Sequence, residues 1–188
     1  MENNNDVRIA WIDVETNGVD ARPKHNGKLF QVAAIITDGD FNELDVIETT
    51  FYFPETEAAK LRALANPYVQ KMHDATDLWK NLSNLENQSY ENFDNIFARW
   101  LQKHEPEPNK LVMGGNSITL DREFLREFLP KSFACLSYQS LDMSSIQRFF
   151  ELIEGRPEFE KKKTHAALDD IRESIAQARW HRDYVKAA

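Results

Sequence analysis

The fold is decided by the stretch Ile9-Ala10-Trp11-Ile12-Asp13-Val14-Glu15-Thr16-Asn17-Gly18. Apolar residues dominate its first half, which predicts a buried β-strand that ends as the acidic residues begin. Side chains two residues apart in a strand point to the same face, so Asp13 and Glu15 leave this strand side by side. Two close carboxylates repel each other and each is costly to bury, so the pair indicates a cation site. The alternative is an incidental pair in an acidic chain.

Composition places the chain among ordinary globular proteins. It has 188 residues, of which 41% are hydrophobic and 29% are charged, and we expect one domain over 1–188 with a polar tail at 1–6. Its one cysteine, Cys135, cannot form an internal disulfide, and we predict that it is a small buried core residue. We find no pattern of a secretory signal and no apolar run long enough to cross a bilayer. We therefore expect a cytoplasmic protein without a membrane partner.

The formal net charge of −8 restricts the partners. Proteins that coat long nucleic acids usually present a basic surface, because much of their affinity comes from neutralising phosphates. An acidic chain disfavours that mode of binding. A short anionic substrate held through metal ions remains open, because the ions supply the missing positive charge.

Hydrophobic periodicity and turn residues predict the order of the elements. We predict strands over 8–13, 29–37, 44–53, 110–114 and 134–141, and helices over 57–65, 90–103, 119–129 and 167–185. A broken helix is predicted over 68–79, and a capping-box pattern predicts that a further helix opens at Ser144. Short connections between the first three strands indicate an antiparallel meander. The whole order predicts an α/β fold with a mixed five-stranded sheet flanked by helices.

Two further acidic positions accompany the first pair. Asp121 falls on the apolar face of the helix predicted over 119–129, where solvated acids are rare. His165 precedes the acids Asp169 and Asp170 at a loop-to-helix junction. Either acid could merely favour the helix N-terminus, and a lone loop histidine is more often solvated than catalytic. The ordered set of Asp-x-Glu, a helical Asp and a His before a late Asp makes a joint site the stronger hypothesis.

This ordered set resembles the DEDDh exonucleases of the ribonuclease H-like superfamily. Residues 13–16, 116–121 and 165–170 match the three motifs of that group, and the runs 115–118, 121–125 and 167–175 make the oligoribonuclease family most similar. The resemblance covers about residues 9–184. It implies a ribonuclease H-like fold and hydrolysis from the 3′ end of a short single-stranded oligonucleotide, most readily RNA, to nucleoside 5′-monophosphates. A homodimer is implied by the resemblance alone.

The resemblance also implies roles for five residues. Asp13, Glu15, Asp121 and Asp170 would hold two divalent cations, and carboxylate oxygens suit Mg²⁺ or Mn²⁺. Two such ions would orient the attacking water and steady the leaving oxygen. His165 would be the general base, because the pKa of a histidine lies close to working pH.

Further positions match residues that hold substrate in the family. Val19 stands where an apolar wedge separates two bases, and Tyr68 and His73 match an aromatic residue and a histidine near the substrate. Ser117, Tyr138 and Ser144 match hydroxyls that cap the substrate's 5′ phosphate, part of that cap coming from the second subunit. Thr16, Gly18 and Asn116 complete the expected substrate-binding set. By alignment, Gln139 replaces an arginine of the cap, and a neutral amide lacks the charge and the bidentate fork of a guanidinium.

Three functions remain open on the sequence. The leading hypothesis is a metal-dependent exoribonuclease for short oligoribonucleotides. Gln139 and the variant first motif (Glu-Thr-Asn-Gly) keep a 3′–5′ exonuclease on single-stranded DNA or longer RNA as the alternative. The third is a non-catalytic binding module on the same fold, which the retention of all four carboxylates and the histidine disfavours.

Overall fold

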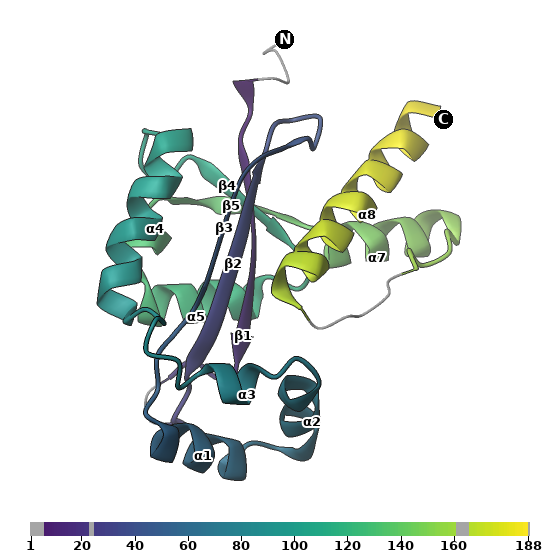
Figure 1. Cartoon of the computed structure of the whole chain (residues 1–188). Coiled ribbons are helices and arrows are strands. Elements are labelled where there is room, and N and C mark those ends of the chain that lie inside the picture. The colour runs from purple at the N-terminus through teal and green to yellow at the C-terminus, as the bar shows by residue number, and fades with distance from the viewer. Residues whose placement is uncertain (1–5, 23–24, 161–165, 188) are drawn as a thin grey trace.

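The computed structural model describes residues 6–22, 25–160 and 166–187, and one five-stranded sheet organises them (Figure 1). The strands lie in the order β3-β2-β1-β4-β5. Their bounds are β1 Ile9–Thr16, β2 Leu29–Thr37, β3 Glu43–Thr50, β4 Leu111–Gly115 and β5 Leu136–Asp142. β1 pairs antiparallel with β2 and parallel with β4. The sheet is therefore mixed, and the predicted meander of the first three strands is confirmed.

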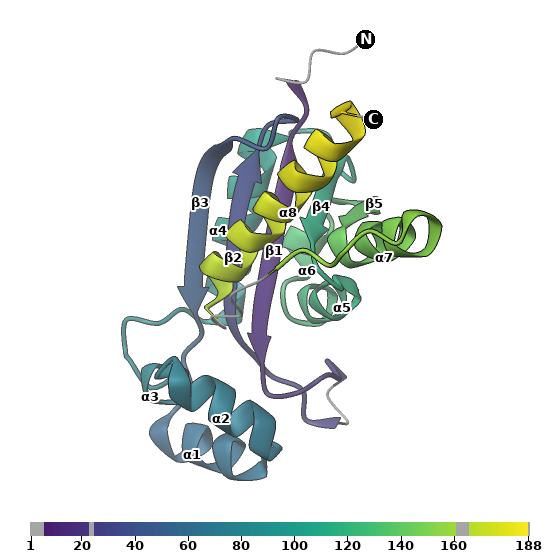
Figure 2. The same cartoon turned by 90° about the vertical axis from the view of Figure 1, so that its right-hand side faces the viewer.

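Helices cover both faces of this sheet (Figures 1 and 2). In chain order they are α1 Glu55–Leu64, α2 Pro67–Ala75, α3 Leu78–Asn81, α4 Tyr90–His104, α5 Thr119–Phe128, α6 Pro130–Phe133, α7 Met143–Glu154 and α8 Ala167–Ala187. The larger hydrophobic core lies between the sheet and the helices α1 to α5, and a smaller one lies under α8. The α/β fold expected from the sequence is confirmed.

The alternation of β1 assigns its side chains to these two cores. Ala10, Ile12 and Val14 belong to the larger core, whereas Ile9 and Trp11 belong to the core under α8. Asp13 and Glu15 continue the second series, since strand side chains repeat every two residues. Both carboxylates therefore lie on the face that α8 covers.

Three local predictions need correction. β1 runs on to Thr16 because β2 pairs with it through Leu29, so both carboxylates stand within the strand and not beyond its end. α7 begins at Met143, and its N-cap is Asp142, whose Oδ1 accepts the Ser144 and Ser145 amide hydrogens at 2.9 and 3.4 Å. The capping box predicted from Ser144 is therefore wrong. The short helix α6 was not predicted.

Other local predictions hold. The broken helix over 68–79 is resolved into α2 and α3, with Asp77 between them in the left-handed region at a φ of 54°. Cys135 is buried, as expected. In the described part of the chain, no helix is long and apolar enough to cross a membrane.

Candidate active site

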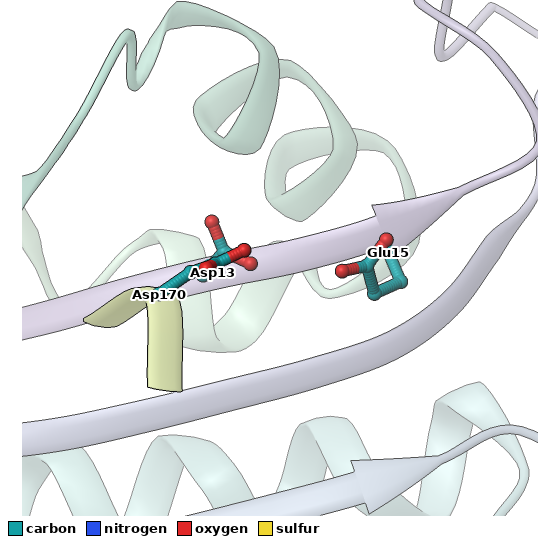
Figure 3. Close-up of side chains that lie close together, drawn as sticks. All are labelled: Asp13, Glu15 and Asp170. Atoms are coloured by element: carbon teal, nitrogen blue, oxygen red, sulfur yellow. The ribbon is translucent and has the colours of Figure 1, made fainter. Parts of the chain in front are cut away.

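Three carboxylates converge on the α8 face of the sheet (Figure 3). Asp13 and Glu15 come from β1, and Asp170 comes from the first turn of α8. One oxygen of each lies within 4.8 Å of the others, which is close enough for the three to share a cation. The neighbouring Asp169 is exposed, so of the two acids offered by the sequence only Asp170 faces β1.

Asp121 approaches the same strand from the opposite side. It is buried on α5, and its Oδ1 accepts the Val14 amide hydrogen at 3.1 Å. Val14 lies between Asp13 and Glu15, so this hydrogen bond holds the Asp121 carboxylate beside the strand that carries them, although Asp121 is not one of the three carboxylates whose oxygens lie within 4.8 Å of one another. The negative charge of Asp121 contributes to raising the pKa of Glu15.

The electrostatics of this cluster favour a cation. Burial, followed by the charges of Asp170 and Asp121, raises the pKa of Glu15 to about 8. Burial also raises the pKa of Asp121, against the opposing hydrogen bond from Val14. Both shifts express the cost of holding several negative charges in a poorly hydrated space. A divalent cation would remove that cost, so these residues fit the metal that their oxygen ligands suggest.

His73 of α2 contacts the end of β1, the strand that carries Asp13 and Glu15. Its side chain is 1% exposed and packs edge-on against Phe30 and Trp79. Its Nε2 donates to the Thr16 carbonyl oxygen at 2.8 Å, and its Nδ1 lies 3.7 Å from Glu15 Oε2. The structure thus places His73 behind Glu15, where it holds the end of β1. The substrate contact expected for it stays a prediction.

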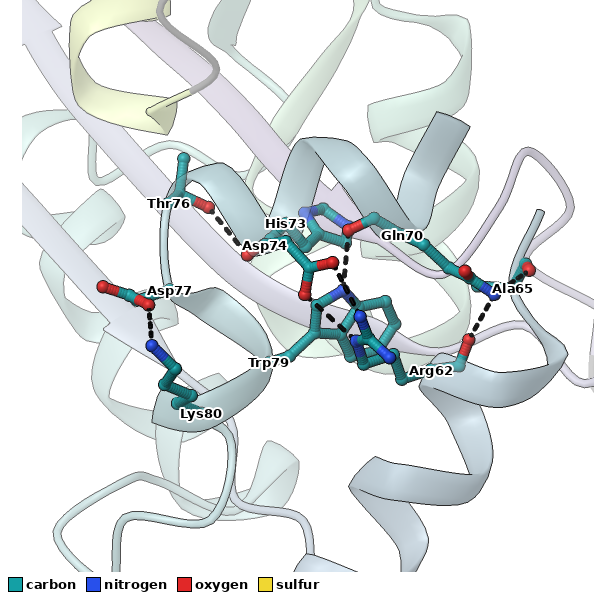
Figure 4. A network of polar contacts seen from close by, with 9 residues as sticks. All are labelled: Arg62, Ala65, Gln70, His73, Asp74, Thr76, Asp77, Trp79 and Lys80. Carbon is teal, nitrogen blue, oxygen red and sulfur yellow. Dashed lines mark hydrogen bonds and ion pairs between the residues drawn. The ribbon is translucent and has the colours of Figure 1, made fainter. Parts of the chain in front are cut away.

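Polar contacts fix the helix that carries His73 (Figure 4). Arg62 of α1 forms a two-pronged ion pair with Asp74 at 3.0 and 2.7 Å. Gln70 donates to the carbonyl oxygens of Arg62 and Ala65, and Trp79 Nε1 donates to the Gln70 carbonyl oxygen at 3.2 Å. These bonds tie α1, α2 and α3 together at the end of the sheet.

A second group of predicted residues forms a continuous hydrogen-bonded chain. Ser117 Oγ and Ser144 Oγ lie 3.0 Å apart, and Ser144 Oγ donates to Asn116 Oδ1 at 3.2 Å. Asn116 Nδ2 donates to Ser174 Oγ at 2.7 Å, and Ser174 Oγ donates to the Asp170 carbonyl oxygen at 3.0 Å. Ser174 was missed by the sequence analysis, although it stands one helical turn after Asp170.

The remaining predicted substrate residues differ in exposure. The side chains of Val19, Tyr68 and Tyr138 are 84%, 65% and 85% exposed, and Gln139 is also exposed. Thr16 is buried, with its hydroxyl donating to the Gly18 carbonyl oxygen at 2.7 Å. A Cβ at Gly18 would meet no atom within 4 Å, so the fold does not require glycine there.

Tyr138 and Gln139 belong to an irregular part of the edge strand β5. Leu111 pairs with Leu136 and Met113 pairs with Ser140, so β5 holds two extra residues between these pairs. Such bulges re-aim side chains and are frequent beside active sites. His165, the expected general base, lies outside the described residues, and its role stays a prediction.

The mixed sheet thus brings carboxylates from its central strand and from a late helix to one place, where their oxygens can hold a metal ion. The exonuclease family RNase_T matches residues 10–178. An oligoribonuclease of Francisella tularensis subsp. tularensis (strain WY96-3418) is 33% identical over 177 residues, which cover 93% of each chain. An oligoribonuclease of Vibrio cholerae serotype O1 (strain ATCC 39541) is 33% identical over 183 residues and 96% of each chain.

Solved structures show the same fold. The zinc-bound E. coli exonuclease I complex with single-stranded DNA superimposes with a TM-score of 0.69 at 17% identity. The match covers 96% of this chain but 43% of that one, so this chain spans less than half the length of exonuclease I. Exonuclease I of Methylocaldum szegediense matches with a TM-score of 0.67 at 17% identity, over 94% of this chain and 40% of that chain.

The chain belongs to the RNase_T exonuclease family. It is a 3′–5′ exonuclease and thus a hydrolase of phosphodiester bonds. The predicted enzyme class and family resemblance are confirmed, which decides against a non-catalytic binding module.

Proposed function

We propose that this exonuclease hydrolyses short single-stranded oligoribonucleotides to nucleoside 5′-monophosphates with the help of two divalent cations, Mg²⁺ or Mn²⁺. The convergence of Asp13, Glu15 and Asp170 within 4.8 Å carries the proposal. Relatives that match along nearly their whole length bear the name oligoribonuclease, which supports the short RNA substrate.

The four carboxylates share one task in this mechanism. Asp13, Glu15 and Asp170 would hold the cations together with Asp121, whose position is fixed by the Val14 amide. Bound divalent cations would supply positive charge to the scissile phosphate and acidify the attacking water. His165 would accept the proton of that water. Glu15 is buried, so bulk water would not weaken the attraction between its carboxylate and a bound cation.

Residues outside the carboxylate cluster would select the substrate. Val19 is exposed next to the end of β1 and would separate the two bases of a dinucleotide. The hydroxyls of Ser117 and Ser144 belong to the hydrogen-bonded chain that reaches the Asp170 carbonyl oxygen, and they would donate to a phosphate oxygen by turning away from Ser144 and Asn116. Tyr138 and Gln139 project from the bulge of β5 toward solvent.

Competitive hydrolysis tests this function. RNA of two, three and seven nucleotides, each with a 5′ phosphate, is mixed with matching DNA in Mg²⁺ and separately in Mn²⁺. We expect the RNA dinucleotide to disappear first. The alternative, an exonuclease for single-stranded DNA or longer RNA, is favoured by the neutral and exposed Gln139. It predicts flat length dependence or faster cleavage of DNA.

We also propose a homodimer. α7 exposes Phe149, Leu152 and Ile153 at 57%, 71% and 56%, in a spacing that places them on one face of the helix. α7 follows the edge strand β5, so a second copy could cover this apolar face and the edge together. Light scattering gives the mass in solution. We expect a dimer for the wild type and a monomer for Phe149→Glu, and a monomeric wild type would contradict the proposal.

A further inference from the structure

Asp170 is held in place differently from the two carboxylates that it meets. Asp13 and Glu15 are fixed by β1, which has a hydrogen-bonded strand on each side. Asp170 comes from the first turn of α8 (Figure 3), and the ends of helices fray. Its carboxylate stays beside the other two only if contacts outside this turn hold the start of α8 against the sheet.

Apolar packing restrains α8 only loosely. Ile171 and Ile175 are buried in the smaller core and hold the helix on the sheet. Such contacts are non-directional, so a small rotation or shift of the helix changes the buried area little. A functional side chain needs placement to within about 0.5 Å, which hydrogen bonds behind it provide. We therefore looked for a directional contact at the start of α8.

Ser174 makes such a contact one helical turn after Asp170. Its side chain is buried, and its Oγ donates to the Asp170 carbonyl oxygen at 3.0 Å. The same Oγ accepts from Asn116 Nδ2 at 2.7 Å. A hydroxyl has one donor and two acceptor positions, so it makes both bonds at once. A serine that bonds back to the preceding turn slightly destabilises a helix, so the helix itself gives no reason for a serine here.

Asn116 connects the Ser174 hydroxyl to the sheet. Gly114 of β4 pairs with Trp11 of β1 in parallel register. Continuing this register by two residues places Asn116 beside Asp13, on the face that α8 covers. The hydrogen bond from Asn116 to Ser174 therefore spans the gap between the sheet next to Asp13 and the first turns of α8.

The Asn116 amide is itself held at both ends. Its Nδ2 donates to Ser174, and its Oδ1 accepts from Ser144 Oγ at 3.2 Å. Ser144 lies in the first turn of α7, so the amide has partners in two helices. We propose that Ser174, held by Asn116, is a positioning residue that fixes the metal ligand Asp170 at its distance from β1. The inference rests on the metal site of the proposed function and not on its substrate.

A second polar anchor, near the other end of α8, offers a matched control. Arg182 Nη1 donates to the Asp40 carbonyl oxygen at 2.8 Å, in the turn between β2 and β3. The Arg182 guanidinium also lies 5.6 Å from the centre of the Phe41 ring. The 12 residues from Asp170 to Arg182 span about 18 Å at 1.5 Å per residue. Loss of this anchor weakens the docking of α8 without touching the turn that carries Asp170.

Titration of Mn²⁺ into the substrate-free protein tests the inference. Calorimetry gives the dissociation constant of Mn²⁺, and thermal unfolding in chelator gives the Tm. We expect Ser174→Ala to raise the dissociation constant by about 10- to 100-fold, the effect of losing a hydrogen bond behind a metal ligand. Asn116→Ala should act in the same way, and the double variant should lose little more than either single variant, because both remove one shared hydrogen bond. Arg182→Gln should lower the Tm and leave the dissociation constant unchanged.

A pair of variants with the same shape separates the hydroxyl from the packing. Threonine keeps the hydroxyl, which can bond to the preceding turn of a helix, and valine replaces it with a methyl group. Any crowding by the added methyl group is common to both. Ser174→Thr should therefore bind Mn²⁺ about 10-fold or more tightly than Ser174→Val.

Two outcomes would overturn the inference alone. One is an unchanged Mn²⁺ dissociation constant in Ser174→Ala together with equal values for the Thr and Val variants, because Ser174 would then serve only packing. The other is a loss of Mn²⁺ affinity in Arg182→Gln as large as in Ser174→Ala, because any loosening of α8 would then suffice.

The proposed function fails in a different way. A wild type that binds no Mn²⁺ contradicts the metal site and the inference together. A wild type that prefers long RNA or DNA contradicts only the proposed substrate, since the Mn²⁺ comparison is made without one.

Discussion

The carboxylate site and the β5 edge differ in how firmly the fold holds them. Asp13 and Glu15 stand on a strand that has neighbours on both sides, and Asp121, His73 and α8 enclose that strand. Tyr138 and Gln139 stand on an edge strand, in a bulge that exposes both. The proposed catalytic residues therefore occupy the centre of the sheet, while the residues proposed to recognise substrate occupy an edge where a residue can change without disturbing the core.

The largest expected loss of activity comes from a substitution on the central strand β1. Asp13→Ala removes a metal ligand, and we expect hydrolysis to fall by more than about 10²-fold, the upper effect of altering residues that only support a ligand. The fold should persist, because the change also removes carboxylate repulsion. Activity assays with circular dichroism check both points. Undiminished turnover would contradict the metal assignment.

His165→Ala tests whether proton transfer is separate from metal binding. We expect the rate to fall by about 10²–10⁴-fold, the range for loss of a general base. Calorimetric titration of Mn²⁺ should give the wild-type affinity, since the four carboxylates remain. A large loss of Mn²⁺ affinity would assign His165 to the metal site instead.

His73→Phe tests whether the contacts of His73 with Thr16 and Glu15 hold the end of β1 in place. The ring is kept, but the buried Thr16 carbonyl loses its donor, which costs about 1–3 kcal/mol. Loss of the contact behind Glu15 should lower metal affinity or activity by about 10–100-fold. Thermal unfolding and Mn²⁺ titration measure the two effects. His25→Ala is the matched control, because His25 is exposed and pairs with Asp20. Unchanged affinity would show that β1 holds Glu15 without help.

The smallest effect concerns stability and its dependence on pH. The pKa of Glu15 is raised to about 8 in the metal-free fold, so the folded state binds this proton more tightly than the unfolded state. Stability is then lost as pH rises from the unfolded pKa of about 4.5 through 8. We expect Glu15→Gln to raise the Tm of the chelator-treated protein near pH 9 by at least about 2–4 °C, the shift for 1 kcal/mol.

Near pH 4.5 the same substitution should change the Tm little, because the carboxyl is then protonated in the fold. Adding Mg²⁺ near pH 9 should give the wild type a higher Tm than Glu15→Gln, since only the wild type keeps the charged ligand at position 15. An equal gain at both pH values would mean that Glu15 is destabilising for reasons other than its charge.

Much of the fold could be predicted from the sequence because the patterns that predict strands and helices are local. Alternation and apolar runs predicted all five strands, and helical periodicity predicted α4, α5 and α8 to within a few residues. The cap of α7 was assigned wrongly because Asp142 and Ser144 are both good N-cap residues, and the choice depends on where β5 stops. The length of β1 was underestimated because its pairing partner, β2, decides where it ends.

The sequence by itself determined the pairing of Asp13 with Glu15, because the two-residue repeat of a strand needs no tertiary contact. It also determined the order of the acidic motifs, from which the family resemblance followed. The resemblance had also selected Asp170 over Asp169. Only the tertiary structure decided that Asp170 faces β1, that His73 lies behind Glu15, and that Ser174 connects Asn116 to α8. Those arrangements depend on how distant segments pack, and the periodicity of one segment shows which face is buried but not which other segment covers it.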